Sequence, residues 1–182
     1  MIQACIITES QSDMDIIKKI LSDELLESTK LYAGLGQYDA HSMATTILLA
    51  DRIPVVLIVD TRADDKDIVV EKFNDINFLM RQSSPGVPYK IVMAVPEIEV
   101  VLLQNRDLIE KIIGQHFTDL EWEFACCHPK RFLSRFLGDK SQYIQTIFEN
   151  MNAVELSQLQ QHPIMAEITN FLSNVFATYT KA

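Results

Sequence analysis

One five-residue segment constrains the fold more than any other part of the chain. Residues 55–59, VVLIV, are continuously apolar and mostly β-branched, and they lie between Pro54 and Asp60. A strand without polar and apolar alternation is typical of the centre of a parallel sheet, where helices cover both faces. The segment therefore predicts an α/β fold, with Asp60 at the carboxyl end of a buried strand.

Strand and helix patterns alternate over the first 114 residues. The expected strands are residues 2–8, 29–33, 55–59 and 89–95. Apolar residues that recur at three- and four-residue steps predict helices between and after these strands. The expected helices are one that begins at an N-cap Ser12, and residues 39–51, 66–82 and 97–113. Such alternation indicates a parallel sheet with right-handed crossovers.

The strand pattern stops at about residue 115. The rest of the chain predicts helices over residues 130–137, 140–150 and 163–178. We expect an α/β domain over 1–114 and a helical extension over 115–182 that packs on the same domain. The last helix carries an apolar stripe wide enough either to cover the sheet or to form a subunit interface in a homodimer. The sequence leaves both alternatives open.

Composition limits the classes of partner. The formal net charge is −9, which opposes broad contact with a phosphate backbone. It does not exclude an enzyme that acts on nucleic acid while a divalent metal masks its carboxylates. Lys130, Arg131 and Arg135 lie close together in the sequence. They form either a local basic patch or an ordinary solvated helix face.

The cysteines and the apolar segments bear on the cellular compartment. Three cysteines, two of them adjacent, make a poor disulfide framework, and we interpret Cys126, Cys127 and His128 as structural residues because zinc-ligand spacing is missing. No apolar run is long enough to span a bilayer, and residues 2–8 fit a buried strand better than a signal peptide. We expect a cytoplasmic protein with reduced thiols and no membrane segment.

Acidic residues follow the predicted strands. Glu9, Asp60 and Glu97 come at or just after strand ends, and Asp64 and Glu99 lie close behind. Carboxyl ends of parallel strands meet at one edge of the sheet, where function concentrates. Clustered carboxylates recruit a hard cation such as Mg²⁺, with Mn²⁺ as a substitute, and such an ion could activate water at a phosphodiester.

A structural interpretation competes with this metal site. Acidic side chains also stabilise helix N-termini, and that role would explain Asp13, Asp65 and Glu97. It explains Asp60 less well, because Asp60 directly ends a buried strand. A similar choice applies to Gly34 and Gly36, which would form either a phosphate-binding loop or a tight turn, since the Lys-Ser/Thr of a P-loop is missing.

The ordered motifs resemble a known family. The run CIITESQSDMDIIKKIL resembles the first motif of topoisomerase–primase (Toprim) domains, YAGLGQYDA resembles their glycine-containing turn, and RIPVVLIVDTRADD resembles their third strand with its terminal aspartate. The set is similar to the Toprim domains of overcoming-lysogenization-defect (OLD) nucleases and to small standalone bacterial Toprim-like proteins. IVMAVPEIEVVLL and HPKRFLSRFL are similar to later segments of the standalone proteins, so the resemblance covers the whole chain.

The resemblance implies a Rossmann-like Toprim fold that positions Mg²⁺ for phosphodiester cleavage or strand transfer. Glu9 matches the family glutamate, a general acid or base beside the metal, and Asp60 matches the first aspartate of an Asp-x-Asp motif. Arg62 stands where the second aspartate is expected. Asp64 or Asp65 would substitute if the loop folds back, and Arg62 would instead bind phosphate as a bidentate donor.

Two functions of different classes follow. The first is a Mg²⁺-dependent nuclease acting on DNA or RNA, with Glu9 and Asp60 essential and Asp64, Glu97 or Glu99 assisting the metal. The alternative is a non-catalytic Toprim-like module that works through a partner ATPase or another protein, as Arg62 at the aspartate position suggests. A small-molecule binding domain is a third option, which an apolar pocket at the strand ends would support.

Overall fold

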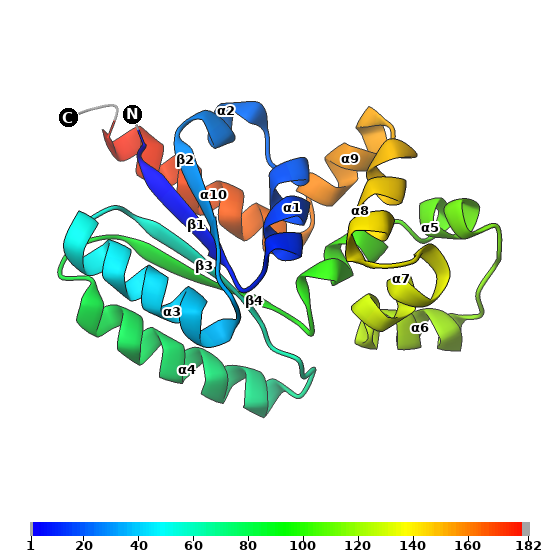
Figure 1. The fold of residues 1–182 in the computed structure, drawn as a ribbon, viewed down its shortest axis with the longest axis horizontal. Helices are drawn as coiled ribbons and strands as arrows, with labels where there is room; N and C mark the ends of the chain where they lie inside the picture. Colours follow the sequence, from blue (N-terminus) through cyan, green and yellow to red (C-terminus); the bar gives the residue numbers. More distant parts are fainter. Residues whose placement is uncertain (1, 180–182) are drawn as a thin grey trace.

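A computed structural model describes residues 2–179 and places four parallel strands in one sheet (Figure 1). The strand order is β2-β1-β3-β4. The strands are β1 (Ala4–Thr8), β2 (Thr29–Ala33), β3 (Val55–Asp60) and β4 (Tyr89–Ala94). Each of the four predicted strands is present, and the predicted α/β class is confirmed.

β3 lies inside the sheet between β1 and β4, as its apolar run predicts. All six of its residues are buried, and Leu57 pairs with Ile7 on one side and Ile91 on the other. Val55, Leu57 and Val59 face one hydrophobic cluster, whereas Val56 and Ile58 face another. Two covered faces explain why no polar residue interrupts this strand.

Ten α-helices, one π-helix and one 3₁₀-helix complete the described part of the chain. Those of the α/β region are α1 (Gln11–Ile20), α2 (Asp23–Glu27), α3 (Gln37–Thr46), the π-helical η1 (Ile47–Asp51), α4 (Lys66–Ser83), the 3₁₀-helical η2 (Ile98–Gln104) and α5 (Arg106–Ile113). The extension contains α6 (Asp119–Cys127), α7 (Pro129–Leu137), α8 (Lys140–Glu149), α9 (Ala153–Gln160) and α10 (Pro163–Tyr179).

The helices cover both faces of the sheet. α3 and α4 lie on one face, and α1 and α10 lie on the other (Figure 1). The buried stripe of α10 packs against the sheet and not against solvent; its members are Ile164, Met165, Ile168, Leu172 and Val175. The first of the two interpretations of this stripe is therefore confirmed, because the chain itself buries these side chains.

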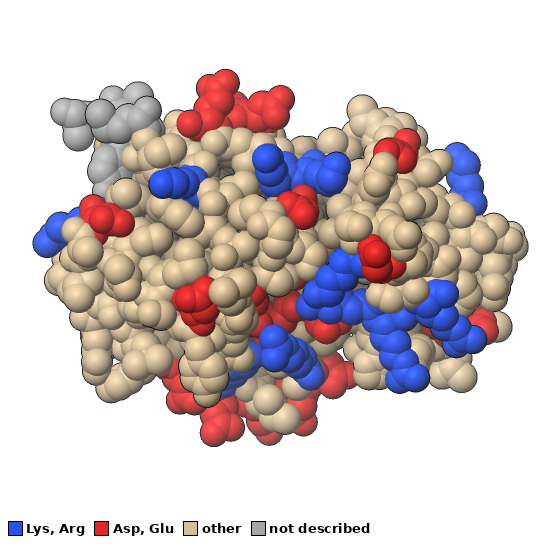
Figure 2. All heavy atoms as spheres, viewed as in Figure 1, with Lys and Arg blue, Asp and Glu red and all other residues tan. Residues whose placement is uncertain are grey.

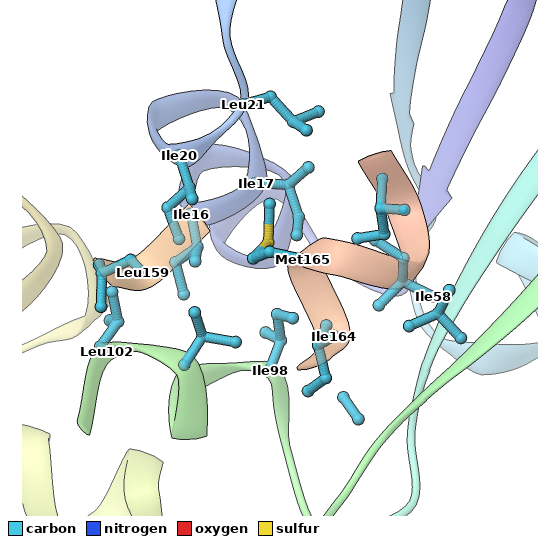
Figure 3. Packing of buried hydrophobic residues seen from close by; sticks show 14 of the residues in the cluster. Ile16, Ile17, Ile20, Leu21, Ile58, Ile98, Leu102, Leu159, Ile164 and Met165 are labelled. Carbon is cyan, nitrogen blue, oxygen red and sulfur yellow. The ribbon is translucent and has the colours of Figure 1, made fainter. Parts of the chain in front are cut away.

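α5 to α9 form a helical lobe beside the carboxyl edge of the sheet (Figure 1). One hydrophobic cluster joins this lobe to the sheet. Figure 3 shows Ile16 and Ile20 of α1 directed toward Leu102 of η2 and Leu159 of α9, with Met165 of α10 close by. The shared core holds the lobe over the strand ends. The division into domains at residue 114 stays a prediction.

Several local predictions are wrong at the level of single residues. The N-cap of α1 is Ser10 and not Ser12, since the Ser10 side chain accepts a hydrogen bond from the Asp13 amide. The predicted helix over 97–113 is interrupted at Asn105, whose side chain caps α5 by accepting from the Leu108 amide. A capping residue inside an apolar periodic segment can therefore divide one predicted helix into two.

Three helices escaped the sequence analysis, namely α2, α6 and α9. They have five to nine residues, and the apolar residues of α6 and α9 do not gather on one face. α6 and α9 are instead fixed by capping boxes, Thr118 with Glu121 and Asn152 with Glu155. In α4 the buried face is formed by Ile76 and Met80, whereas Ile68 and Leu79 are half exposed.

Candidate functional site

The parallel register brings all four strand ends to one edge, as the sequence predicted. Thr8 pairs with Ala33, and Asp60 pairs with Ala94, so the residues that follow these strands lie together. A cavity of about 320 Å³ opens at this edge. Its lining includes Glu9, Asp13, Gly34, Asp60, Arg62 and Lys130.

Three buried carboxylates meet at this edge. Asp13 comes from α1, Asp60 from the end of β3 and Glu99 from η2, and one oxygen of each lies within 4.8 Å of the others. Each residue is at most 4% exposed. Asp60 and Glu99 were candidates from the sequence, whereas Asp13 was interpreted as a helix-capping acid. Asp13 does lie in the first turn of α1, but its burial beside Asp60 sets it apart from an ordinary cap.

Asp60 links three parts of the molecule. Its Oδ1 accepts a hydrogen bond of 2.9 Å from the Ile98 amide, and its Oδ2 lies 2.6 Å from Lys130 Nζ. Its backbone carbonyl accepts from Lys72 Nζ. The carboxylate at the end of β3 therefore fixes the start of η2 and binds a cation from α7.

Glu99 is the most deeply buried carboxylate of the group. Its Oε1 accepts a 2.8 Å hydrogen bond from the Tyr143 hydroxyl, and its Oε2 has no hydrogen-bond partner within residues 2–179. Burial raises the pKa of Glu99 to about 7, against the opposing charge of Lys130 and with help from the charge of Asp13. This carboxyl can therefore change protonation state near neutral pH.

Glu9 is paired with Arg62. The Arg62 Nη2 donates to Glu9 Oε2 at 2.8 Å, while Glu9 Oε1 is buried without a hydrogen-bond partner among the described residues. Burial and the negative charge of Asp60 raise the pKa of Glu9, and Arg62 opposes them. Arg62 has a left-handed backbone conformation, with φ of 57°. Its backbone amide donates a hydrogen bond to the Pro96 carbonyl. The residue at the expected aspartate position thus serves as a counter-ion.

Lys130 lies at the carboxylate cavity, where sequence reasoning did not place it. It was expected on a basic patch or a solvated helix face, yet its side chain is only 22% exposed. Its Nζ lies 2.6 Å from Asp60, 3.6 Å from Glu99, 3.7 Å from Glu97 and 4.0 Å from Asp13. Burial acts to lower the pKa of Lys130, but the charges of Glu99 and Asp60 outweigh it and raise the pKa.

The remaining acidic candidates lie in different surroundings. Glu97 contacts Lys130 twice, since its Oε2 accepts from the Lys130 amide at 3.3 Å and its Oε1 faces the ammonium. Asp64 is exposed and points to Cys127, 3.9 Å away, and no ion pair or hydrogen bond of the described residues joins it to Asp60. Asp65 caps α4 through the Asp67 and Ile68 amides, so its structural interpretation is confirmed.

The glycine turn after β2 is already hydrogen-bonded. The Gly34 amide donates to the Thr8 carbonyl and the Gly36 amide donates to the Glu9 carbonyl. A Cβ at Gly34 would lie 2.8 Å from the backbone nitrogen of Ala40, so close packing requires glycine there. The turn lines the cavity, but neither amide is free to bind a phosphate, and a phosphate-binding role for these glycines stays a prediction.

The donor set suits a hard divalent ion. Three carboxylates from separate elements offer oxygen atoms within 4.8 Å of one another, and one oxygen of Glu99 has no hydrogen-bond partner among the described residues. Mg²⁺ and Mn²⁺ prefer such oxygen ligands. The competing cation at this point is Lys130.

Two expectations from composition concern the rest of the molecule. The three cysteines, Cys5, Cys126 and Cys127, are free thiols. None of the helices within residues 2–179 has the length and apolar character needed to cross a membrane.

Comparisons with known proteins bear on the fold. Neither the protein-family models nor the curated proteins gave a match. Among solved structures, the chain is similar to the C-terminal region of the OLD protein of Xanthomonas campestris pv. campestris, with 12% sequence identity and a TM-score of 0.50 over 98% of each chain. At this identity the similarity concerns the fold alone. The chain therefore has the overall fold of that region, a parallel α/β architecture consistent with the Rossmann-like Toprim fold that its motifs predict.

Proposed function

We propose that this protein is a Mg²⁺-dependent phosphodiesterase that acts on nucleic acid. The observation that carries the proposal is the convergence of Asp13, Asp60 and Glu99, buried and within 4.8 Å, at the carboxyl edge of the sheet. Burying several carboxylates together is costly unless a cation compensates them. The shared fold with the OLD C-terminal region agrees with the nuclease-like motifs.

Each side chain has a distinct task in this proposal. Asp13, Asp60 and Glu99 would hold the ion, which when bound would supply charge stabilisation and an acidified water. Glu9 keeps Oε1 free because Arg62 binds Oε2, and this oxygen can accept a proton. Arg62 is 61% exposed, so its remaining N–H groups can donate to a phosphate oxygen.

A local basic surface supports a nucleic-acid substrate despite the net charge of −9. Arg62 and Lys140 line the carboxylate cavity, and Arg131 lines an adjoining one. Arg131 and Arg135 then line an apolar hollow of about 420 Å³ between α6 and α7. Figure 2 shows basic side chains gathered over the region of α7, close to acidic side chains near the sheet. The cations form a path that leads to the carboxylates.

Aromatic rings accompany this path. Phe124 is 47% exposed, and the Arg131 guanidinium lies 5.9 Å from its ring centre. Arg135 lies 5.4 Å from the ring centre of Phe136, which is partly buried against Phe117 and Phe132. Phosphate contacts from arginine together with exposed aromatic rings are the usual means of binding single strands without sequence preference. We therefore favour a single-stranded substrate or the frayed end of a duplex.

Cleavage assays test the proposal. Single-stranded DNA, duplex DNA and single-stranded RNA are each incubated with the protein and Mg²⁺ or Mn²⁺, and with EDTA. We expect cleavage with metal, and a loss of about 100-fold or more in Glu9→Gln, the size typical of a lost proton-transfer group. Asp60→Asn should lose activity as well, with circular dichroism to confirm folding. Asp107→Asn, at an exposed position of α5, is the matched control. Full activity of both site variants would refute the proposal.

One observation favours a second function. Lys130 and Arg62 already pair with carboxylates at the strand ends, so part of the negative charge of the site is compensated without metal. A non-catalytic module that works through a partner ATPase or another protein would need nothing more. In that case the isolated chain should neither cleave nucleic acid nor bind Mg²⁺ in a calorimetric titration. Measurable Mg²⁺ or Mn²⁺ binding would count against this alternative.

A further inference from the structure

Lys130 stands at the point where the carboxylates offer their oxygen atoms. Its ammonium contacts Asp60 at 2.6 Å and has Glu99 and Asp13 within 4.0 Å. The oxygens of these same three residues form the potential metal site. A divalent ion bound to all three would therefore fall where the ammonium lies, and like charges this close repel strongly in a buried setting.

The backbone of Lys130 is fixed while its side chain can move. Pro129 and Lys130 form the first turn of α7, and the Lys130 amide donates to Glu97 Oε2. Phe132 and Leu133 anchor the helix in the core. The flexible four-carbon stem of lysine lets its ammonium swing away without displacing the helix, and the side chain already reaches solvent in part.

A second observation points to an ion-accepting position. Glu99 is fully buried and its Oε2 has no hydrogen-bond partner among the described residues, although it faces the ammonium at 3.6 Å. A buried carboxylate oxygen normally has hydrogen bonds that satisfy it. At 3.6 Å the ammonium balances its charge but does not complete its bonding, and this oxygen therefore remains available as a ligand.

We propose that Lys130 is a tethered cation that occupies the divalent-ion position and must leave it before an ion can bind all three carboxylates. The inference rests on the metal-dependent function proposed above. In the absence of metal, Lys130 keeps the buried carboxylates compensated, so the site is folded in advance. When a divalent ion binds, the released ammonium lies beside the site, where it can contact a phosphate.

Metal binding and metal-dependent stability test this proposal without any cleavage assay. Mn²⁺ is titrated calorimetrically into the wild type, Lys130→Met and Lys18→Met, and thermal unfolding is followed with EDTA and with Mn²⁺. We expect Lys130→Met to bind Mn²⁺ more tightly than the wild type by about tenfold or more. It should melt lower than the wild type in EDTA and recover with Mn²⁺. Lys18→Met, which removes an equal charge from the exposed face of α1, should behave as wild type.

The outcomes separate this inference from the proposed function. Equal Mn²⁺ affinity in the wild type and Lys130→Met would overturn the displacement and leave a metal-dependent enzyme in place. Failure of every variant to bind Mn²⁺ would overturn both. If Lys130→Met does not fold even with Mn²⁺, Lys130→Arg provides the test, because it keeps the tethered charge and should bind Mn²⁺ no more tightly than the wild type. Tighter binding by Lys130→Arg would contradict the proposal.

Discussion

The hydrogen bond between Tyr143 and Glu99 gives a stability prediction that depends on pH. Tyr143 is fully buried in α8, and its hydroxyl donates to Glu99 Oε1 at 2.8 Å. Tyr143→Phe keeps the ring and removes this donor, which is the one hydrogen bond to the Glu99 side chain within residues 2–179. We expect the protein to lose stability, and to lose more when Glu99 is ionised.

The expected magnitude follows from the charge of the acceptor. Hydrogen bonds to a charged group contribute about 1.5–3 kcal/mol, against about 0.5–1.5 kcal/mol for neutral pairs. Because the pKa of Glu99 is raised from 4.5 to about 7 in the folded protein, its carboxyl ionises first in the unfolded chain, and the free energy of unfolding falls as pH rises from 4.5 to 7. Tyr143→Phe lacks a donor that favours the ionised form of Glu99, so the pKa of Glu99 should rise further in this variant. The decrease in its free energy of unfolding with pH should therefore continue above pH 7.

Urea unfolding in EDTA, followed by circular dichroism, measures this difference. Tyr143→Phe should lower the free energy of unfolding by about 2 kcal/mol at about pH 8.5, and by about 1 kcal/mol at about pH 5.5. In a Glu99→Gln background the loss should be about 1 kcal/mol at both pH values, because the glutamine carbonyl still accepts but does not titrate. Equal losses at the two pH values in the Glu99 background would refute the reasoning.

Three other substitutions test the fold. Gly34→Ala would place a Cβ 2.8 Å from the Ala40 nitrogen, so it should lower the melting temperature and the free energy of unfolding by about 1–3 kcal/mol; an unchanged melting curve would contradict the packing. Leu102→Ala empties a fully buried position and should cost about 2–5 kcal/mol in urea unfolding, and a far smaller loss would mean that this contact is outside the core. Glu110 has its pKa lowered to about 2, first by the Phe117 amide. Because its folded pKa is depressed, its contribution to stability is present above pH 4.5 and is lost as pH falls toward 2. Thermal melts of the wild type and Glu110→Gln should therefore differ most above pH 4.5 and converge toward pH 2, and a constant difference would disprove this role.

The structure also shows that the surrounding fold decides whether an acidic residue near a helix start only caps the helix. Asp13 and Asp65 both follow short polar residues near a helix start, and both predicted capping roles. Asp65 is an exposed N-cap, whereas Asp13 is buried beside Asp60. An aspartate near a helix start is either an exposed cap or a buried carboxylate of the site. Its burial depends on which other segments pack over it and not on its neighbours in sequence.

The sequence alone determined the sheet and the place of Glu9 and Asp60 at its edge. An apolar run such as 55–59 has a physical meaning within a few residues, since only two covered faces tolerate it, and a residue that directly follows such a strand must lie at the sheet edge. Tertiary structure alone decided the charge balance of the site. Lys130 lies 70 residues from Asp60 in sequence, and its pairing depends on how α7 docks over the strand ends through a shared core. Nothing local distinguishes it from a solvated lysine, because desolvation and ion pairing arise only when distant elements pack together.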